Sequence, residues 1–297
     1  MNLYNGDIMK VEHINNDVVL TNVSDFNIQQ IFECGQCFHF EKLDNMEYVT
    51  VAFGRMLRIK QENNKVIMFN TSEDEYNSIW RSYFDMDTDY GKIKRELESK
   101  CDELKGAINE KSGIRILRQE FTEILLSFII SQNKQIPHIK QIVAAISKEY
   151  GQLVGSVNGK EYYSFPSLDV LANISEDEFR KLKTGFRAPY LCDAVRYLKK
   201  WSEEESFAGL TYEEAKEKLL QIKGVGDKVA NCVLLFGLGY TSAFPVDVWI
   251  KRIMEHLYFK KDTPKDKIVK FADERFGKYG GYAQQYLFYF ARDGKVD

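Results

Sequence analysis

The sequence has few cysteines, and they form no cluster. Five cysteines in 297 residues do not make a disulfide framework. Cys34 and Cys37 have the C-x-x-C spacing, but no second pair completes a zinc site and no βαβ pattern supports a redox site, so we interpret the pair as chance. The cysteine cluster of an iron–sulfur centre is also missing near the C-terminal end. We therefore expect no metal ion and no cofactor.

The sequence also lacks a signal peptide and any long uninterrupted apolar run. Both absences favour a soluble intracellular protein with no membrane contact. With 44% hydrophobic and 13% aromatic residues, the chain can build a substantial core. Its length allows two domains or one large domain. No signal of symmetry is present, so we expect a monomer.

Net charge is only −3, but the charge is unevenly distributed. Residues 1–105 carry 12 basic and 19 acidic side chains, whereas residues 106–297 carry 29 basic and 25 acidic ones. The segment KLKTGFRAPYLCDAVRYLKK (181–200) has six basic residues and one acidic residue. A local basic patch binds phosphate even on an acidic chain, although a solvated helix face has the same composition.

The periodicity predicts an α+β protein, with a twisted antiparallel sheet followed by helices. Residues 47–70 contain β-rich runs separated by the turn-like QENNK, and the pattern becomes helical from Glu73. A domain boundary is expected near residues 105–113. Residues 120–132 are apolar nearly all round, which predicts a central buried helix. Further helices are predicted over 137–151, 167–175, 175–182 and 211–222.

A glycine-rich turn stands between two helical stretches in LLQIKGVGDKVANCVLLFGLG, residues 219–239. One helix ends at Gly224 and the next begins near Gly226, because glycine permits positive φ and close approach of another backbone. The exposed amides at the start of the second helix suit a phosphate. The pattern is typical of a helix–hairpin–helix DNA-binding unit.

Lys228 lies in the first turn of that second helix, where the helix dipole disfavours a cation. A helix N-terminus and a low dielectric both lower the pKa of a lysine and free a nucleophilic amine. Asp247, just after Pro245, precedes another helical segment and is positioned to cap it. A carboxylate near the lysine can stabilise a cationic sugar and assist proton transfer. Each residue alone fits an ordinary surface or capping role, but together they indicate chemistry on DNA.

Five separated motifs resemble those of the 8-oxoguanine DNA glycosylases, a branch of the helix–hairpin–helix glycosylases that have a Gly/Pro-rich loop and a downstream catalytic aspartate (HhH-GPD). In chain order they are GQCFHF (35–40), LRQEFTEILLSFIISQNKQI (117–136), GFRAPYL (185–191), GVGDKVANC…PVDV and GYAQQYLF (281–288). The resemblance covers nearly the whole chain. It implies an N-terminal sheet domain over 1–106 and an α-helical HhH-GPD catalytic domain over 107–297.

The resemblance implies a catalytic pair and a base-recognition pocket. Lys228 would attack C1′ of the damaged nucleotide, and Asp247 would stabilise the oxocarbenium-like transition state. The carbonyl of Gly35 would accept the N7–H that 8-oxoguanine has and guanine lacks. Three further residues would read the Watson–Crick edge and stack on the two faces of the flipped base: Gln284, Cys232 and Phe288. Without the resemblance, Cys232 and Phe288 would be interpreted as core residues.

The resemblance also implies contacts with the DNA around the flipped nucleotide. Asn133 would fill the space that this nucleotide leaves. Phe186 would wedge beside the orphaned base, and Arg187 would donate to its edge. A DNA phosphate would be bound by the backbone amides of Gly224, Gly226 and Val229.

Two positions depart from the eukaryotic members of the branch. His138 stands where they carry a second arginine that reads the opposite cytosine. Trp249 stands where they carry a histidine, which leaves one phosphate contact open. The first departure predicts a relaxed preference for the base opposite the lesion.

We therefore expect a bifunctional DNA repair glycosylase and abasic-site lyase acting on double-stranded DNA that contains 8-oxoguanine. The composition, rich in Ile, Lys and Asn, indicates an AT-rich bacterium and hence a cytoplasmic, nucleoid-associated enzyme. One alternative is a monofunctional alkylpurine glycosylase of the same fold, against which Lys228 argues. Another is a non-catalytic DNA-binding protein, which would form no adduct trapped by borohydride.

Overall fold

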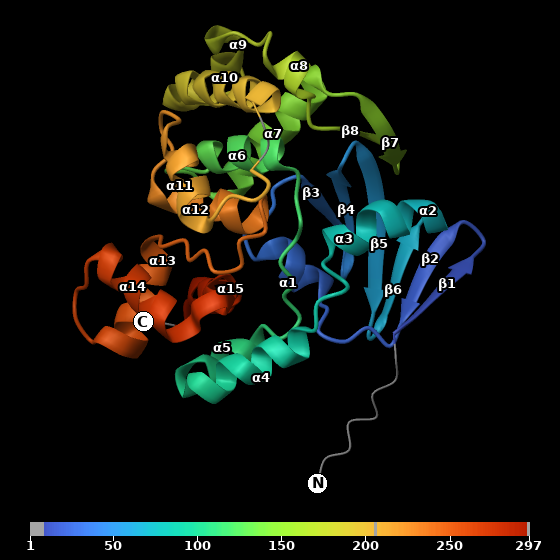
Figure 1. Cartoon of the computed structure of the whole chain (residues 1–297). Helices are drawn as coiled ribbons and strands as arrows, with labels where there is room; N and C mark the ends of the chain where they lie inside the picture. The colour runs from blue at the N-terminus through green and yellow to red at the C-terminus, as the bar shows by residue number, and fades with distance from the viewer. Residues whose placement is uncertain (1–8, 205–206, 296–297) are drawn as a thin grey trace.

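The computed structural model describes residues 9–204 and 207–295. A six-stranded antiparallel sheet lies on one side of the molecule and a helical body on the other (Figure 1), which confirms the predicted α+β class. The strand order is β1-β2-β6-β5-β4-β3. The strands are β1 (Lys10–Ile14), β2 (Asp17–Thr21), β3 (Phe40–Asp44), β4 (Glu47–Ala52), β5 (Arg55–Glu62) and β6 (Lys65–Phe69).

Alternating side chains give the sheet one buried face. In β5, Leu57 and Ile59 are fully buried, while the residues that flank each of them in the strand are partly exposed. The predicted turn between β5 and β6 is present, and Asn63 adopts positive φ there, which suits the tight hairpin. Helix α1 (Ile28–Glu33) packs against this face through Ile28, Ile31 and Phe32.

After β6 the described chain is mainly helical. Its α-helices of four or more residues are α4 (Tyr90–Lys100), α5 (Lys105–Glu110), α6 (Phe121–Ile130), α7 (Ile136–Tyr150), α8 (Leu168–Leu171), α9 (Glu176–Lys181), α10 (Ala188–Glu204), α11 (Tyr212–Leu220), α12 (Asp227–Phe236), α13 (Val248–Met254), α14 (Lys265–Phe276) and α15 (Gly280–Phe290). Short helical turns are α2 (Glu73–Glu75), α3 (Arg81–Tyr83), the 3₁₀ turns Asp102–Leu104, Gly185–Arg187 and Gly277–Tyr279, and the π-helical turns Tyr76–Trp80, Glu255–Phe259 and Ala291–Lys295.

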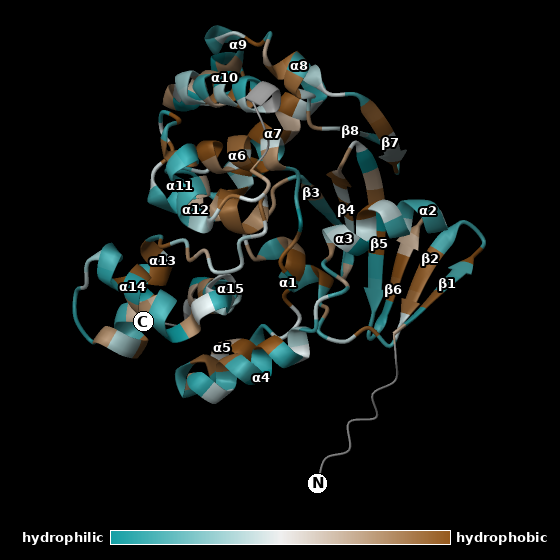
Figure 2. Ribbon diagram, in the orientation of Figure 1, coloured by the Kyte–Doolittle hydropathy of each residue, from teal (hydrophilic) through white to brown (hydrophobic). Residues whose placement is uncertain are grey.

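The predicted central helix is confirmed as α6. Every residue from Glu123 to Ile130 is buried, and the helix packs against α10 and α12. Figure 2 shows α6 as mostly hydrophobic, in contrast with the polar visible face of α11. Because α6 fills the centre of the helical body, it fixes the position of α12, which carries Lys228.

The buried residues form two clusters. One lies under the sheet and reaches Met86, and the other fills the helical body and already includes Tyr90, Ile93 and Leu97 of α4. Along the chain, most of the change from one core to the other falls near residues 86–90, although Leu117 belongs to the first cluster and Cys34 and Phe38 to the second. A domain division at residue 106 stays a prediction.

A two-stranded hairpin that the periodicity did not predict interrupts the helices. Strands β7 (Leu153–Val157) and β8 (Lys160–Tyr163) are joined by Asn158 and Gly159, both with positive φ. The hairpin returns to the sheet (Figure 1), where Lys160 and Tyr162 bond to Glu41 of β3 at 2.5 and 3.0 Å. The sheet and the helical body are thus joined at a second place, far along the chain.

Candidate active site

Helices α11 and α12 and the turn between them form the predicted helix–hairpin–helix. Gly224 has φ of +79°, and a Cβ atom there would lie 2.4 Å from the ring of Tyr190 on α10. Gly226 begins α12 without a capping side chain, and a Cβ there would meet nothing within 4 Å. The first glycine is thus required by packing, and the second leaves the amides at the start of α12 open to a ligand.

Side-chain bonds hold the two helices of the hairpin together. Lys216 on α11 pairs with Asp227 at 2.6 Å. The hydroxyl of Tyr212 donates to Asn231 Oδ1 at 2.6 Å, and Asn231 Nδ2 donates to the Asp227 carbonyl at 2.8 Å. These bonds fix the first turn of α12, from which Lys228 projects.

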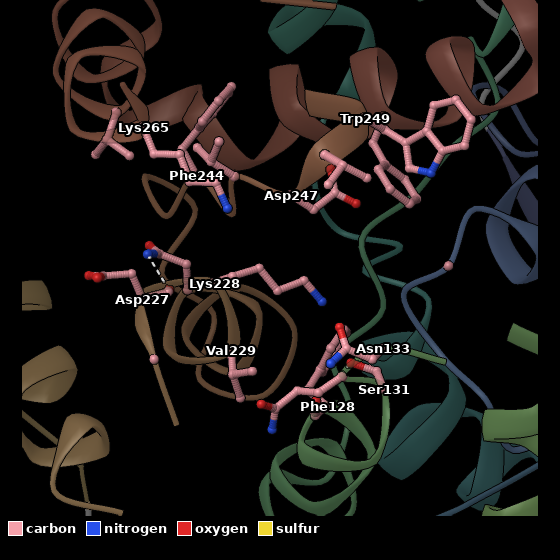
Figure 3. Close-up of a pocket in the computed structure, with 18 of the residues that line it drawn as sticks. Phe128, Ser131, Asn133, Asp227, Lys228, Val229, Phe244, Asp247, Trp249 and Lys265 are labelled. Atoms are coloured by element: carbon pink, nitrogen blue, oxygen red, sulfur yellow. Dashed lines mark hydrogen bonds between the residues drawn. The ribbon is translucent and has the colours of Figure 1, made fainter. Parts of the chain in front are cut away.

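The side chain of Lys228 lies in a cleft of about 1410 Å³. Its Nζ is 4.9 Å from the centroid of the Phe128 ring of α6. Figure 3 shows the amine in the space between Asp247 on one side and Ser131 and Asn133 on the other. Among the described residues, Lys228 and Asp247 form no ion pair within 4.0 Å, although both line the cleft.

Asp247 is the N-cap of α13, as expected. Its Oδ1 accepts the Ile250 N–H at 2.9 Å, and the residue has the extended backbone of a capping position. Phe244 and Val246, just before it, are buried and anchor the connecting segment. The carboxylate is therefore held at the N-terminus of α13, facing the cleft (Figure 3).

Cys232 lies one helical turn after Lys228 and is 3% exposed. Burial raises the pKa of its thiol to about 11, although the nearby Lys228 amine partly offsets the rise and the Asp247 carboxylate adds to it. At neutral pH the thiol is uncharged, and an uncharged thiol suits contact with the face of an aromatic ring.

The other end of the cleft is formed by residues distant in sequence. Gly35 has φ of +85°, and a Cβ there would lie 3.1 Å from Phe288 Cε1. Gln284, one turn before Phe288 on α15, is 4% exposed, and its Oε1 accepts from Gln285 Nε2 at 2.9 Å. The structure thus brings Gly35 and Phe288 together at the cleft, with Gln284 one helical turn away on α15.

The residues expected to touch DNA differ in their exposure. Asn133 is exposed with φ of +52°, and Phe186 is 50% exposed. Arg187 is 4% exposed, and its guanidinium donates to the carbonyls of Gln132 and Thr184. His138 is exposed in the first turn of α7.

Eight of the predicted residues line the cleft directly, and six do not. The first group is Gly35, Asn133, Gly226, Lys228, Val229, Asp247, Trp249 and Phe288. The second is His138, Phe186, Arg187, Gly224, Cys232 and Gln284.

Three residues of the region were missed by the sequence reasoning. Phe128 lies beside the lysine amine, Tyr190 occupies the space beside Gly224, and Arg292 lines the cleft near Gly35. Phe128 and Tyr190 stand inside the quoted motifs, whereas no motif includes Arg292.

No group of three or more His, Cys, Asp or Glu side chains in the described part of the chain is arranged to hold a metal ion. No helix in residues 9–204 or 207–295 is long and apolar enough to cross a membrane.

Comparison with known proteins agrees with this site. Residues 18–125 match the family model of the 8-oxoguanine DNA glycosylase N-terminal domain, and residues 126–278 match that of the HhH-GPD superfamily of base excision DNA repair proteins. A probable N-glycosylase/DNA lyase of Methanothermobacter thermautotrophicus is 32% identical, over 70% of this chain and 72% of its own. The N-glycosylase/DNA lyase OGG1 of Arabidopsis thaliana is 29% identical, over 86% and 75%.

Solved structures are similar over almost the whole molecule. The Clostridium acetobutylicum 8-oxoguanine glycosylase/lyase, in complex with double-stranded DNA containing cytosine opposite 8-oxoguanine, has a TM-score of 0.91 and 40% identity, covering 98% of this chain and 99% of its own. A 3-methyladenine DNA glycosylase from Archaeoglobus fulgidus has a TM-score of 0.75 at 20% identity, covering 93% and 98%, and shares the fold. The chain therefore belongs to the HhH-GPD superfamily of base excision DNA repair proteins, in the branch that carries the 8-oxoguanine DNA glycosylase N-terminal domain.

Proposed function

We propose that the protein is an 8-oxoguanine DNA N-glycosylase and abasic-site lyase. The observation that carries the proposal is the placement of the Lys228 amine and the Asp247 carboxylate in one cleft, directly behind a helix–hairpin–helix. The amine is a nucleophile once it is neutral, and the carboxylate is a fixed charge beside it. The hairpin supplies open amides that bind a DNA phosphate next to this pair.

The reaction follows from these two groups. The lone pair of Lys228 Nζ forms a bond to C1′ while the C1′–N9 bond breaks, and its electrons leave with the base, which takes up a proton. Asp247 stabilises the positive charge that develops on the sugar. The amine then loses its proton and the sugar ring opens to a Schiff base. Loss of a C2′ proton and departure of the 3′-phosphate cleave the strand by β-elimination.

The remaining site residues take the roles that the family resemblance implies. Gly35 accepts the N7–H of the flipped base, Gln284 reads its Watson–Crick edge, and the uncharged Cys232 and Phe288 enclose its faces. The substrate is double-stranded DNA, which the Clostridium acetobutylicum relative also binds. We infer that the protein acts as a monomer on chromosomal DNA, which in a bacterium lies in the nucleoid.

Borohydride trapping tests the proposal, because reduction of the Schiff base leaves a covalent protein–DNA adduct. The wild-type protein is incubated with duplexes that contain 8-oxoguanine, guanine or an alkylated purine at one position. We expect excision and an adduct only with 8-oxoguanine. In Lys228→Gln we expect neither, with DNA affinity largely retained because the hairpin amides are unchanged.

Lys267→Gln, at an exposed position of α14, is the matched control and should behave as wild type. Wild-type excision by Lys228→Gln would refute the assignment of the nucleophile. Excision of the alkylated purine without an adduct would indicate a monofunctional alkylpurine glycosylase. Binding without excision of any of the three bases would indicate a non-catalytic DNA-binding protein.

A further inference from the structure

Arg292 lines the cleft beside Gly35. It stands in the π-helical turn Ala291–Lys295, just after α15. Its Nη2 donates to the carbonyl of Glu33, at the end of α1. Its guanidinium carbon lies 4.8 Å from the centroid of the Tyr289 ring and 5.7 Å from that of Phe288. The Nη2 side of the guanidinium is therefore fixed against the main chain of Glu33, two residues before Gly35.

The other half has no partner. Nη1 of Arg292 is buried and makes no hydrogen bond within the described residues. A Cβ on Gly35 would lie 3.3 Å from this nitrogen and 3.1 Å from Phe288 Cε1, so the nitrogen lies beside Gly35 next to the aromatic ring. A buried donor without an acceptor is uncommon in proteins and unfavourable, more so when it is charged. Its position on the cleft indicates that a ligand supplies the acceptor.

8-Oxoguanine carries a hydrogen-bond acceptor, O8, at a position where guanine has none. In 8-oxoguanine the five-membered ring presents N7–H and C8=O8 side by side, a donor next to an acceptor. In guanine the same edge presents a bare N7 and C8–H. A protein carbonyl next to an N–H donor can bond to both atoms of the 8-oxoguanine edge, the carbonyl to N7–H and the donor to O8. In the same arrangement it can bond to neither atom of the guanine edge.

We propose that Arg292 is a specificity-determining residue that donates its Nη1–H to O8 of the flipped base. The assignment rests on the proposed function, in which Gly35 accepts the adjacent N7–H. The Phe288 ring packs against Gly35, and in this proposal the entering base takes the space between them and uncovers Nη1. Guanine in that position leaves the donor unpaired and turns its N7 lone pair toward the Gly35 carbonyl.

The test compares 8-oxoguanine with 8-thioguanine, which keeps N7–H but replaces O8 by sulfur, a weaker acceptor. Single-turnover excision is measured for the wild-type protein and for Arg292→Met. We expect Arg292→Met to lose roughly ten- to hundredfold in rate on 8-oxoguanine, the range of one hydrogen bond to a charged group. The loss on 8-thioguanine should be several times smaller. Strand cleavage at a preformed abasic site, which has no base to read, should fall much less.

Arg292→Lys provides a second variant. Its single ammonium nitrogen can hold the Glu33 carbonyl or reach the base, but not both, so a deficit on 8-oxoguanine should remain while the melting temperature stays near that of wild type. Arg55→Met, at an exposed arginine of β5, is the control and should excise normally. Equal losses on 8-oxoguanine and 8-thioguanine would overturn the proposal, as would unchanged rates. Failure of the wild-type protein to excise 8-oxoguanine would instead refute the proposed function.

Discussion

Asp247 both begins α13 and faces the cleft, so the two roles must be separated by substitution. Asp247→Asn keeps an oxygen that accepts the Ile250 N–H and removes the charge. We expect 8-oxoguanine excision to slow by a factor on the order of 10² or more, with little change in melting temperature, because asparagine is an equally good cap. Asp247→Ala should lose the same activity and also about 1 kcal/mol of stability. Normal kinetics in a folded Asp247→Asn protein would restrict the residue to capping.

Arg187 and His138 are the side chains that we expect to decide the preference for the base opposite the lesion. Arg187 is bound to two main-chain carbonyls in the free protein, and His138 is exposed where the eukaryotic members carry an arginine. We expect excision opposite cytosine and, less efficiently, opposite the other three bases. Single-turnover rates on four duplexes that differ only at that base measure the preference. A cytosine-to-adenine ratio above about a thousandfold, roughly 4 kcal/mol, would contradict this expectation.

His138→Arg provides the matched variant. A good charged contact to a base contributes discrimination of about 1–3 kcal/mol, or roughly 5- to 150-fold. The arginine should therefore raise the cytosine-to-adenine ratio within that range. An unchanged ratio would show that residue 138 does not reach the opposite base.

Single residues were predictable from the sequence where their roles depend on their neighbours in the chain. Lys228 and Asp247 stand out because a glycine turn and a proline mark the starts of their helices. Arg292 did not stand out, because its place beside Gly35 depends on contact between opposite ends of the sequence. Spacing within one segment contains no information about such a contact.

At the scale of the element, the two hairpin glycines should respond differently to the same change. Gly224→Ala forces a methyl group against the Tyr190 ring at a positive φ, so we expect destabilisation of about 1–3 kcal/mol. Gly226→Ala meets open space and should fold normally. Its methyl group would instead stand where the phosphate approaches, so we expect DNA affinity to fall roughly tenfold. Melting curves and salt-matched binding titrations of both variants check the two halves of this prediction.

Two results would contradict the prediction for the hairpin glycines. If Gly226→Ala bound DNA as tightly as wild type, the phosphate would not approach the start of α12. If Gly224→Ala melted as wild type does, the fit between Gly224 and Tyr190 would not constrain the hairpin.

Helices were predictable where local signals begin and end them. Ser175 and Thr211 each form a capping box with a glutamate three residues later, and Pro137 stands in the first turn of α7. The β7–β8 hairpin was missed even though Asn158-Gly159 is a strong turn signal. Its strands are short and largely exposed, and their contacts with the sheet are with Met56 and Glu41, more than 90 residues earlier.

At the scale of the molecule, one contact between sheet and helices has a pH dependence. The Phe53 N–H, between β4 and β5, donates to Glu120 Oε2 at 2.6 Å, just before α6. Burial raises the pKa of Glu120, and the Glu123 carboxylate raises it further. A raised folded-state pKa means that the folded protein favours the protonated acid. Stability is therefore lost as the pH rises from the ordinary value of 4.5 through the folded value.

Glu120→Gln imitates the protonated acid and keeps an oxygen for the Phe53 N–H. We expect its melting temperature to exceed that of wild type at pH 8 and to match it near pH 4, where both carry an uncharged side chain. Thermal melts at the two pH values measure the difference. Glu12→Gln, on the exposed strand β1, should show no such pattern. A difference that is the same at both pH values would rule out titration of Glu120 as its cause.

The cleft combines residues from both ends of the described sequence, since Gly35 packs against Phe288 and Arg292 and lies across from Lys228. During synthesis on the ribosome, the lysine emerges about sixty residues before Arg292 does. Until then the nascent chain contains the proposed nucleophile but lacks Phe288 and Arg292, two of the residues proposed to contact the base. An amine that attacks sugars without examining the base would damage the genome. Under the proposed roles, selection of the base therefore depends on residues that are translated after the nucleophile.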